Sequence, residues 1–296
     1  MHVFSHRHSV VWRALLGGLA LAAAMPAMAI VVTSNTNAAD LAAAVTAAGG
    51  GGLTVVGTPT LSGHTSGAAT SSGTYSNASG TYSIGSGIVL SSGNVNDYGD
   101  GPNLSAANTT SYGVAATSGQ EALLDPITGG TFNHNDVTQL NVSFTTTTGS
   151  VFFNVVFGSD EFAEFKNTTF IDAFGLYLDG VNIAFYLGSP VNINHPAMDF
   201  RAGTELDGVL PGTGGPMLFS ATGLSLTDTH TLTFIIADSG DSILDSTAYI
   251  GSLGAVAPPP PPPPPPTGVP EPASLALTGV ALVAMAAVRR RKQTPA

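Results

Sequence analysis

Short apolar stretches separated by glycine, serine and threonine fill most of the chain between residues 53 and 253. Residues 137–144 alternate apolar and polar side chains, a pattern typical of a strand with one buried face. Residues 150–157 are almost continuously apolar and predict a central strand that is covered on both faces. Further strands are predicted at 53–56, 87–90, 231–237 and 247–253.

The clearest local feature is a β-hairpin. Residues 173–178 and 181–187 both have strand patterns and flank Asp179 and Gly180. Asp and Gly accept the positive φ angles that a two-residue hairpin turn requires. The pattern therefore predicts two antiparallel strands joined at this turn.

One short helix is predicted near the start, over residues 37–45. It begins with Asn37, a good helix-capping residue, and continues with Asp40 and a run of alanines, before glycines at 49–52 end it. Many short strands with frequent turns, and no regular alternation with helices, predict an all-β fold. A β-sandwich is the expected form, and a jelly roll is one arrangement that fits.

The N-terminal residues 1–29 have the three parts of a secretory signal peptide. Arg7 and Arg13 give a positive start, residues 14–24 form a short apolar run, and Ala27 and Ala29 offer small residues at a cleavage site. The apolar run is shorter than the ~20 residues that a membrane-spanning helix needs. We therefore expect export by the Sec machinery and cleavage after Ala29.

The C-terminal region carries a second set of processing features. Prolines at 258–266 predict a stiff spacer over residues 258–268, about 28 Å long for the proline run at ~3.1 Å per residue. An apolar stretch at 273–288 then predicts a short transmembrane helix in the inner membrane. It is followed by four basic residues that favour retention on the cytoplasmic side, namely Arg289, Arg290, Arg291 and Lys292.

Between the spacer and this helix lie Val269, Pro270, Glu271 and Pro272. With the apolar helix and the basic cluster, they resemble the PEP-CTERM sorting signal of Gram-negative bacteria, here at residues 269–293. The resemblance implies that an exosortase cleaves near the motif and releases or transfers the domain. A permanent single-span anchor is the alternative, although so short a stretch spans a membrane only marginally.

Charge separates the middle of the chain from its ends. Six of the eight basic residues lie in the end segments, and residues 30–257 hold 18 acidic against two basic residues, a net charge of −16. Nucleic acid is therefore excluded as a partner, because binding phosphates needs a basic face. The chain has no cysteine, which excludes disulfides and thiolate chemistry.

Four segments in the middle region resemble the choice-of-anchor L domain family. They are residues 90–95 (LSSGNV) with 101–103 (GPN), 156–162 (VFGSDEF), 172–176 (DAFGL) and 237–246 (ADSGDSILDS). Members of this family occur beside varied surface-anchoring signals. The resemblance thus implies a surface location for an extracellular domain at residues 30–257, and it implies no established enzymatic activity.

Acidic residues gather directly after two predicted strands. Asp160 and Glu161 follow one of them, and Asp238, Asp241 and Asp245 follow the other. Carboxylate and carbonyl oxygens in loops at strand ends suit Ca²⁺, which takes six to eight oxygen ligands. These five residues are the candidate calcium ligands, and calcium is the one cofactor that the sequence suggests.

Other interpretations of the acidic residues stay open. Asp, Ser and Gly also form turns that bind nothing, and residues 94–101 offer a further group of oxygen ligands without EF-hand spacing. A glycosidase needs two carboxylates across the scissile bond. Glu161 or Glu164 with Asp238 fits that requirement in type, but nothing in their spacing selects it.

Aromatic and histidine residues add little to the prediction. Four tyrosines are candidates for stacking on sugars or for strand edges, namely Tyr75, Tyr82, Tyr98 and Tyr112. Four scattered histidines without metal-binding spacing are interpreted as loop or surface residues, namely His64, His134, His195 and His230.

Together these features predict an exported cell-surface or extracellular-matrix protein with a non-enzymatic structural or adhesive role. Association with exopolysaccharide or biofilm is inferred from the known setting of exosortase systems and from no particular residue. A secreted, glycosidase-like enzyme that uses the acidic loops is the alternative.

Overall fold

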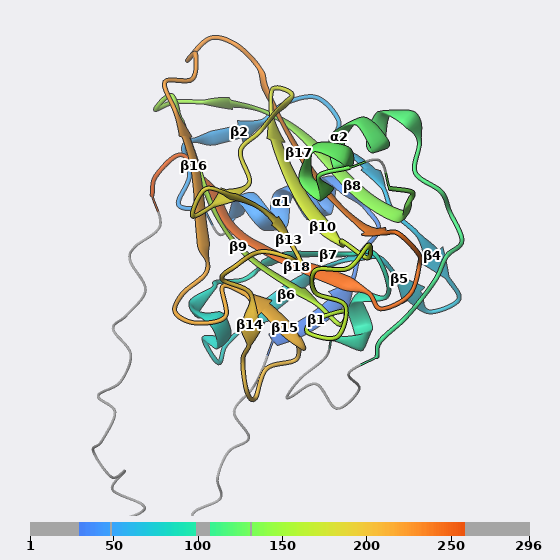
Figure 1. Ribbon diagram of the computed structural model, residues 1–296. Helices are drawn as coiled ribbons and strands as arrows, with labels where there is room; N and C mark the ends of the chain where they lie inside the picture. The colour runs from blue at the N-terminus through green and yellow to red at the C-terminus, as the bar shows by residue number, and fades with distance from the viewer. Residues whose placement is uncertain (1–29, 48, 99–106, 131, 258–296) are drawn as a thin grey trace, which may run out of the picture.

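The computed structural model describes residues 30–47, 49–98, 107–130 and 132–257. Within these ranges, antiparallel strands form two eight-stranded sheets that pack face to face, which confirms the predicted β-sandwich (Figure 1). The predicted signal peptide, proline spacer and sorting segment lie outside the described residues.

The first sheet is built around β9 and β18. Its strand order is β1 (Ile30–Ser34), β6 (Ser72–Asn77), β7 (Gly87–Ser91), β18 (Ser246–Gly254), β9 (Ser150–Ser159), β15 (Gly208–Leu210) and β14 (Asp199–Phe200), and β16 (Met217–Thr222) pairs with the first half of β9.

The second sheet is built around β17 and β8. Its strand order is β12 (Phe185–Tyr186), β13 (Ser189–Asn192), β10 (Ala173–Leu178), β17 (His230–Ser239), β8 (His134–Thr146) and β2 (Leu53–Val55), with β11 (Val181–Asn182) on β10 and β3 (Thr60–Ser62) on β8. Outside both sheets lie the small ribbon of β4 (Thr65–Ser66) and β5 (Ala69–Thr70) and the 3₁₀ turns η1 (Thr81–Ser83) and η2 (Val95–Asp97).

The main core lies between the two sheets. Phe153 of β9 meets Phe234 of β17 edge to face, with ring centroids 6.2 Å apart, so side chains of the two sheets interlock. Leu41 and Val45 of the helix α1 (Ala38–Ala47) join the same core. The described residues hold two further buried clusters beside this main core.

A second helix, α2 (Ser118–Thr128), covers the outer face of the second sheet (Figure 1). Its Leu124 and Ile127 pack against Tyr177 and Ile235. The sequence analysis predicted α1, whose Asn37 side chain caps it by accepting the Ala39 N–H at 2.9 Å, but it missed α2.

The predicted strands are all present, with two corrections. The turn at Asp179 and Gly180 has positive φ angles of 50° and 82°, as expected. The returning strand, however, stops at Asn182, because the Asn182 side chain accepts the N–H of Ala184 and turns the chain away. In β9, Phe152 and Asn154 are only partly buried, so the strand is covered on both faces only over residues 155–159.

Candidate functional site at the acidic end

The ends of strands from both sheets bring the segments that resemble the anchor family to one end of the sandwich. Asp172, just before β10, accepts a hydrogen bond from the Ser239 N–H at the end of β17 (3.0 Å) and one from the Ser246 hydroxyl at the start of β18 (2.8 Å). The Ser92 N–H, just after β7, donates to the Ser246 carbonyl at 3.0 Å. The two sheets are thereby joined by polar contacts beyond the apolar core.

Five buried carboxyl side chains occupy this end, and we call them the acidic cluster. They are Asp160, Glu161, Asp172, Asp238 and Asp245, each at most 2% exposed. The only basic residues of the 30–257 segment are Lys166 and Arg201, which donate to the carbonyls of Met198 and Gly214 instead. The acidic cluster therefore receives no charge compensation from these two side chains.

Two members of the acidic cluster, together with the buried Asp136, hold an extended segment in place. Backbone N–H groups at every second position of residues 108–114 donate to buried carboxylates. The bonds run from Asn108 to Asp160 (2.8 Å), from Thr110 to Asp245 (3.0 Å), and from Tyr112 and Val114 to Asp136 (both 2.9 Å). N–H groups in an extended chain point alternately to opposite sides. This row of acids therefore accepts the N–H groups that the carbonyls of a neighbouring strand would accept.

Four other carboxylate oxygens of the cluster lack such donors. Among the described residues, both oxygens of Asp238, Oε2 of Glu161 and Oδ2 of Asp245 are buried without a hydrogen-bond partner. The hydroxyl of Ser92 lies close enough to lower the pKa of Asp238 slightly, but it is outside ordinary hydrogen-bond geometry. Burying an unpaired carboxylate costs free energy, so a bound proton or cation would stabilise these oxygens.

Burial dominates the electrostatics of the cluster. Loss of hydration raises the pKa of Asp160 to about 7 and that of Asp245 to about 6. Burial, and after it the charge of neighbouring carboxylates, raises the pKa values of Glu161 and Asp238 well above the usual range. The pKa of Asp172 is raised in the same way, although its hydrogen bonds to Ser246 and Ser239 oppose the rise.

Gly93 fits closely against this cluster. A Cβ placed on Gly93 would lie 1.6 Å from Oδ2 of Asp245, so a larger residue there would collide with the carboxylate. The LSSGNV segment thus supplies both the Ser92 hydroxyl and the space for Asp245.

The structure places four of the five predicted calcium ligands together, namely Asp160, Glu161, Asp238 and Asp245. The fifth, Asp241, is only half-buried, and its charge raises the pKa values of Glu161 and Asp172. Of the 94–101 group, Asn94 and Asp97 bond to each other at 2.8 Å in a turn, and residues 99–101 lie outside the described chain.

The acidic cluster does not converge on one point as a complete metal site would. In the described part of the chain, one group of three acidic or histidine ligand atoms lies mutually within 4.8 Å, and it consists of Glu121, Asp125 and His134. Two surface pockets in that part, one between β3 and α2 and one around residues 200–207, are lined by no member of the acidic cluster.

The expectations for tyrosines and histidines need correction. Tyr75, Tyr82 and Tyr98 are buried and therefore not available for stacking on a sugar, and burial raises their pKa values. His134, His195 and His230 are buried rather than at the surface. Hydrophobic neighbours contributed by distant segments, which no local pattern reveals, account for these differences.

Comparison with known proteins identifies the family of the chain. The model of the choice-of-anchor L domain matches residues 30–199, more than half of the chain, and that of the PEP-CTERM protein-sorting motif matches residues 268–292. The chain therefore belongs to the choice-of-anchor L domain family, and it is an exported protein that an exosortase sorts. No curated protein and no solved structure matches it.

The family match stops at Asp199, before the last segment of the acidic cluster. Across the described ranges, the helices are too short or too polar to span a membrane.

Proposed function

We propose that residues 30–257 form a non-catalytic structural or adhesive module of the cell surface whose acidic end binds calcium. The observation that carries this proposal is the Asp238 carboxylate, which is fully buried with both oxygens unpartnered. It lies close enough to Asp172 and Asp245 for their charges to raise its pKa. A divalent cation would remove this unfavourable electrostatic energy.

Calcium suits the chemistry of the cluster better than a transition metal. All the side-chain ligands on offer are oxygens, and Ca²⁺ accepts them in irregular arrangements together with backbone carbonyls and water. Because the carboxylates do not meet at one point, carbonyl and water ligands would complete the coordination. An exported module also meets the calcium concentrations at which weak extracellular sites fill.

Burial of the acids favours this role over glycoside hydrolysis. A glycosidase places its two carboxylates on either side of a bound sugar in an accessible cleft. Glu161 and Asp238 are 1% and 0% exposed, and Glu164 is exposed. Either pair considered for hydrolysis thus includes Asp238, which a polysaccharide chain does not reach from solvent.

We extend the proposal to contact with matrix polysaccharide, for which a surface groove that carries side-chain amides offers a place. The groove has a volume of about 440 Å³ between β3 and α2, and Gln120, Gln139 and Asn141 are among its lining residues. Neutral amides and hydroxyls are groups that hydrogen-bond sugars. Binding of the cells' own polysaccharide that Gln139→Ala weakens would support this contact, and equal binding by both proteins would contradict it.

The calcium proposal is tested by thermal unfolding of residues 30–257 with calcium and with EDTA. We expect calcium to raise the melting temperature, since binding to the folded state stabilises it by ~2.7 kcal/mol at a hundredfold excess over the dissociation constant. Asp238→Asn should abolish the rise.

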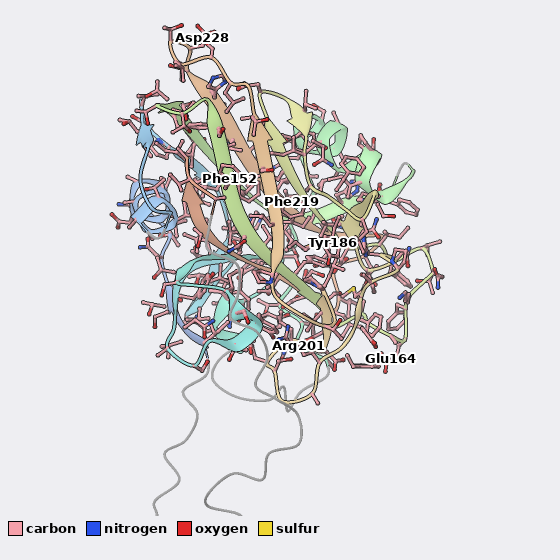
Figure 2. All side chains as sticks on the ribbon, turned by 90° about the vertical axis from the view of Figure 1, so that its left-hand side faces the viewer. Phe152, Glu164, Tyr186, Arg201, Phe219 and Asp228 are labelled. Atoms are coloured by element: carbon pink, nitrogen blue, oxygen red, sulfur yellow. The ribbon has the colours of Figure 1, made fainter. Side chains whose placement is uncertain are left out.

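The matched control is Asp228→Asn. Asp228 is exposed and lies at the end of the sandwich opposite Glu164, an exposed residue close in sequence to Asp160 and Glu161 of the acidic cluster (Figure 2). This variant should keep the full calcium response. A melt that millimolar calcium leaves unchanged in the wild type, or a response that survives in Asp238→Asn, would contradict the proposal.

A further inference from the structure

A second group of potential ligands lies on the opposite face of the second sheet. Along β17, Ile236 points into the core between the sheets and Ala237 into the cluster beneath α2. Because strand side chains alternate, Asp238 belongs to the inner face and Ser239 to the outer face. His134 of β8 pairs in register with Ser239 and so lies on the outer face, under α2.

Two carboxylates of α2 face this histidine. Glu121 and Asp125 are one helical turn apart, and both are half-buried. Nδ1 of His134 bonds to the Glu121 carboxylate, whose other oxygen accepts the His134 backbone N–H at 3.4 Å. One ligand atom from each of the three side chains lies within 4.8 Å of the other two.

The protein's own side chains do not fully balance the charge or the hydrogen bonds of this group. Carboxylates at positions i and i+4 of a helix repel each other, and one imidazole carries at most one positive charge. Nε2 of His134 and the hydroxyl of Ser239, its partner in register, are both buried without a hydrogen-bond partner. The side chains thus lack the closed hydrogen-bonding that a purely structural ion pair would show.

We propose that Glu121, Asp125 and His134 bind a divalent transition-metal ion of the zinc type, which fastens α2 to the start of β8. An ion with two charges balances the two carboxylates, and imidazole is a ligand that zinc and its neighbours accept but calcium does not favour. Three protein ligands leave a position for water, and the Glu121 side chain is 30% exposed, so an ion can enter from solvent. This site is independent of the calcium proposed for the acidic cluster.

The test is titration of residues 30–257 with Co²⁺ as a visible probe and then with Zn²⁺, in buffer that already contains calcium. We expect d–d absorption bands from Co²⁺ that Zn²⁺ removes, and a rise in melting temperature with Zn²⁺. Asp125→Asn and His134→Gln should each weaken Co²⁺ binding at least ~tenfold.

The matched control is His230→Gln. His230 also pairs with a carboxylate, at 2.7 Å from Asp179, but without a third ligand in reach among the described residues. This variant should bind Co²⁺ like the wild type. Absence of the absorption bands in the wild type would overturn the proposal, as would unchanged Co²⁺ affinity in Asp125→Asn, a half-buried position where Asn leaves packing intact.

Discussion

The two ends of β17 place acidic residues in opposite situations. At its start, Asp179 accepts bonds from His230 (2.7 Å) and from the Thr231 N–H (2.8 Å), and its side chain is 46% exposed. At its end, Asp238 is fully buried and neither of its oxygens has a hydrogen-bond partner. A carboxylate that the protein satisfies therefore lies beside one end of β17, and one that it does not satisfy lies at the other end.

The difference between the two ends shows where the stability of the molecule depends on protons and ions in solution. The Asp179–His230 pair needs no further ion, and its partial exposure limits its contribution to stability. The acidic cluster holds several carboxyl groups whose charged forms are penalised, so its stability depends on protons or on a cation. The second end is thus the one suited to sense the medium outside the cell.

The largest expected effect is a loss of stability with rising pH when calcium is absent. The pKa values of Asp160 and Asp245 in the folded protein, about 7 and about 6, exceed the ordinary carboxyl value near 4. The folded state then binds more protons than the unfolded state, so the stability that these groups contribute is complete below about pH 4 and is lost as pH rises through 6 and 7. For Asp160 alone the loss is about 4 kcal/mol.

Urea unfolding in EDTA across this pH range measures the decline. Calcium should offset it increasingly at higher pH, and Asp160→Asn should flatten it. A free energy of unfolding that rises with pH in EDTA would contradict the raised pKa values.

The next effect concerns the space beside Asp245. Gly93→Ala places a methyl group where the Asp245 carboxylate now lies, 1.6 Å from Oδ2, so we expect a destabilisation of about 3 kcal/mol from overpacking and a lost calcium response. Gly119→Ala is the control, because a Cβ there meets nothing within 4 Å and alanine favours the helix α2. Thermal melts that show equal stability for both variants would refute the close fit.

The smallest effect is expected at the opposite end. Asp179→Asn removes the partner of His230, whose pKa the hydrogen bond to Asp179 raises. A half-exposed pair contributes only about 0.5–1 kcal/mol, and this contribution is lost in any case as pH rises through the raised pKa of His230. The calcium response of this variant should equal that of the wild type. A weaker response would contradict the claim that calcium acts only at the end of β17 that holds Asp238.

Local patterns were enough to predict much of the fold. Apolar runs predicted the central strands, Asn37 predicted the start of α1, and Asp179 with Gly180 predicted the hairpin turn. The helix α2 also had a local signal that the sequence analysis did not use. Thr117 and Gln120 form a capping box at its start.

The candidate site was predictable only in part, because long-range contacts decide the role of each acid. Asp160 and Asp238 were predicted at the ends of two strands, and the structure buries both at the same end of the sandwich, while their calcium binding stays a prediction. Which acids anchor residues 108–114 and which remain unpaired depends on bonds such as Thr110 to Asp245, between residues 135 positions apart. The metal site proposed at His134 was missed for the same reason, since two of its candidate ligands lie on the overlooked helix.

The central claim, that calcium completes the acidic cluster, is tested most directly by titration calorimetry near neutral pH in two buffers with different protonation enthalpies. Calcium that replaces protons on groups with raised pKa values must release those protons, so the observed heat should differ between the buffers, and Asp238→Asn should release fewer protons. Saturable binding with proton release is the result that the account predicts. No binding heat in either buffer, or binding without proton release, would contradict it.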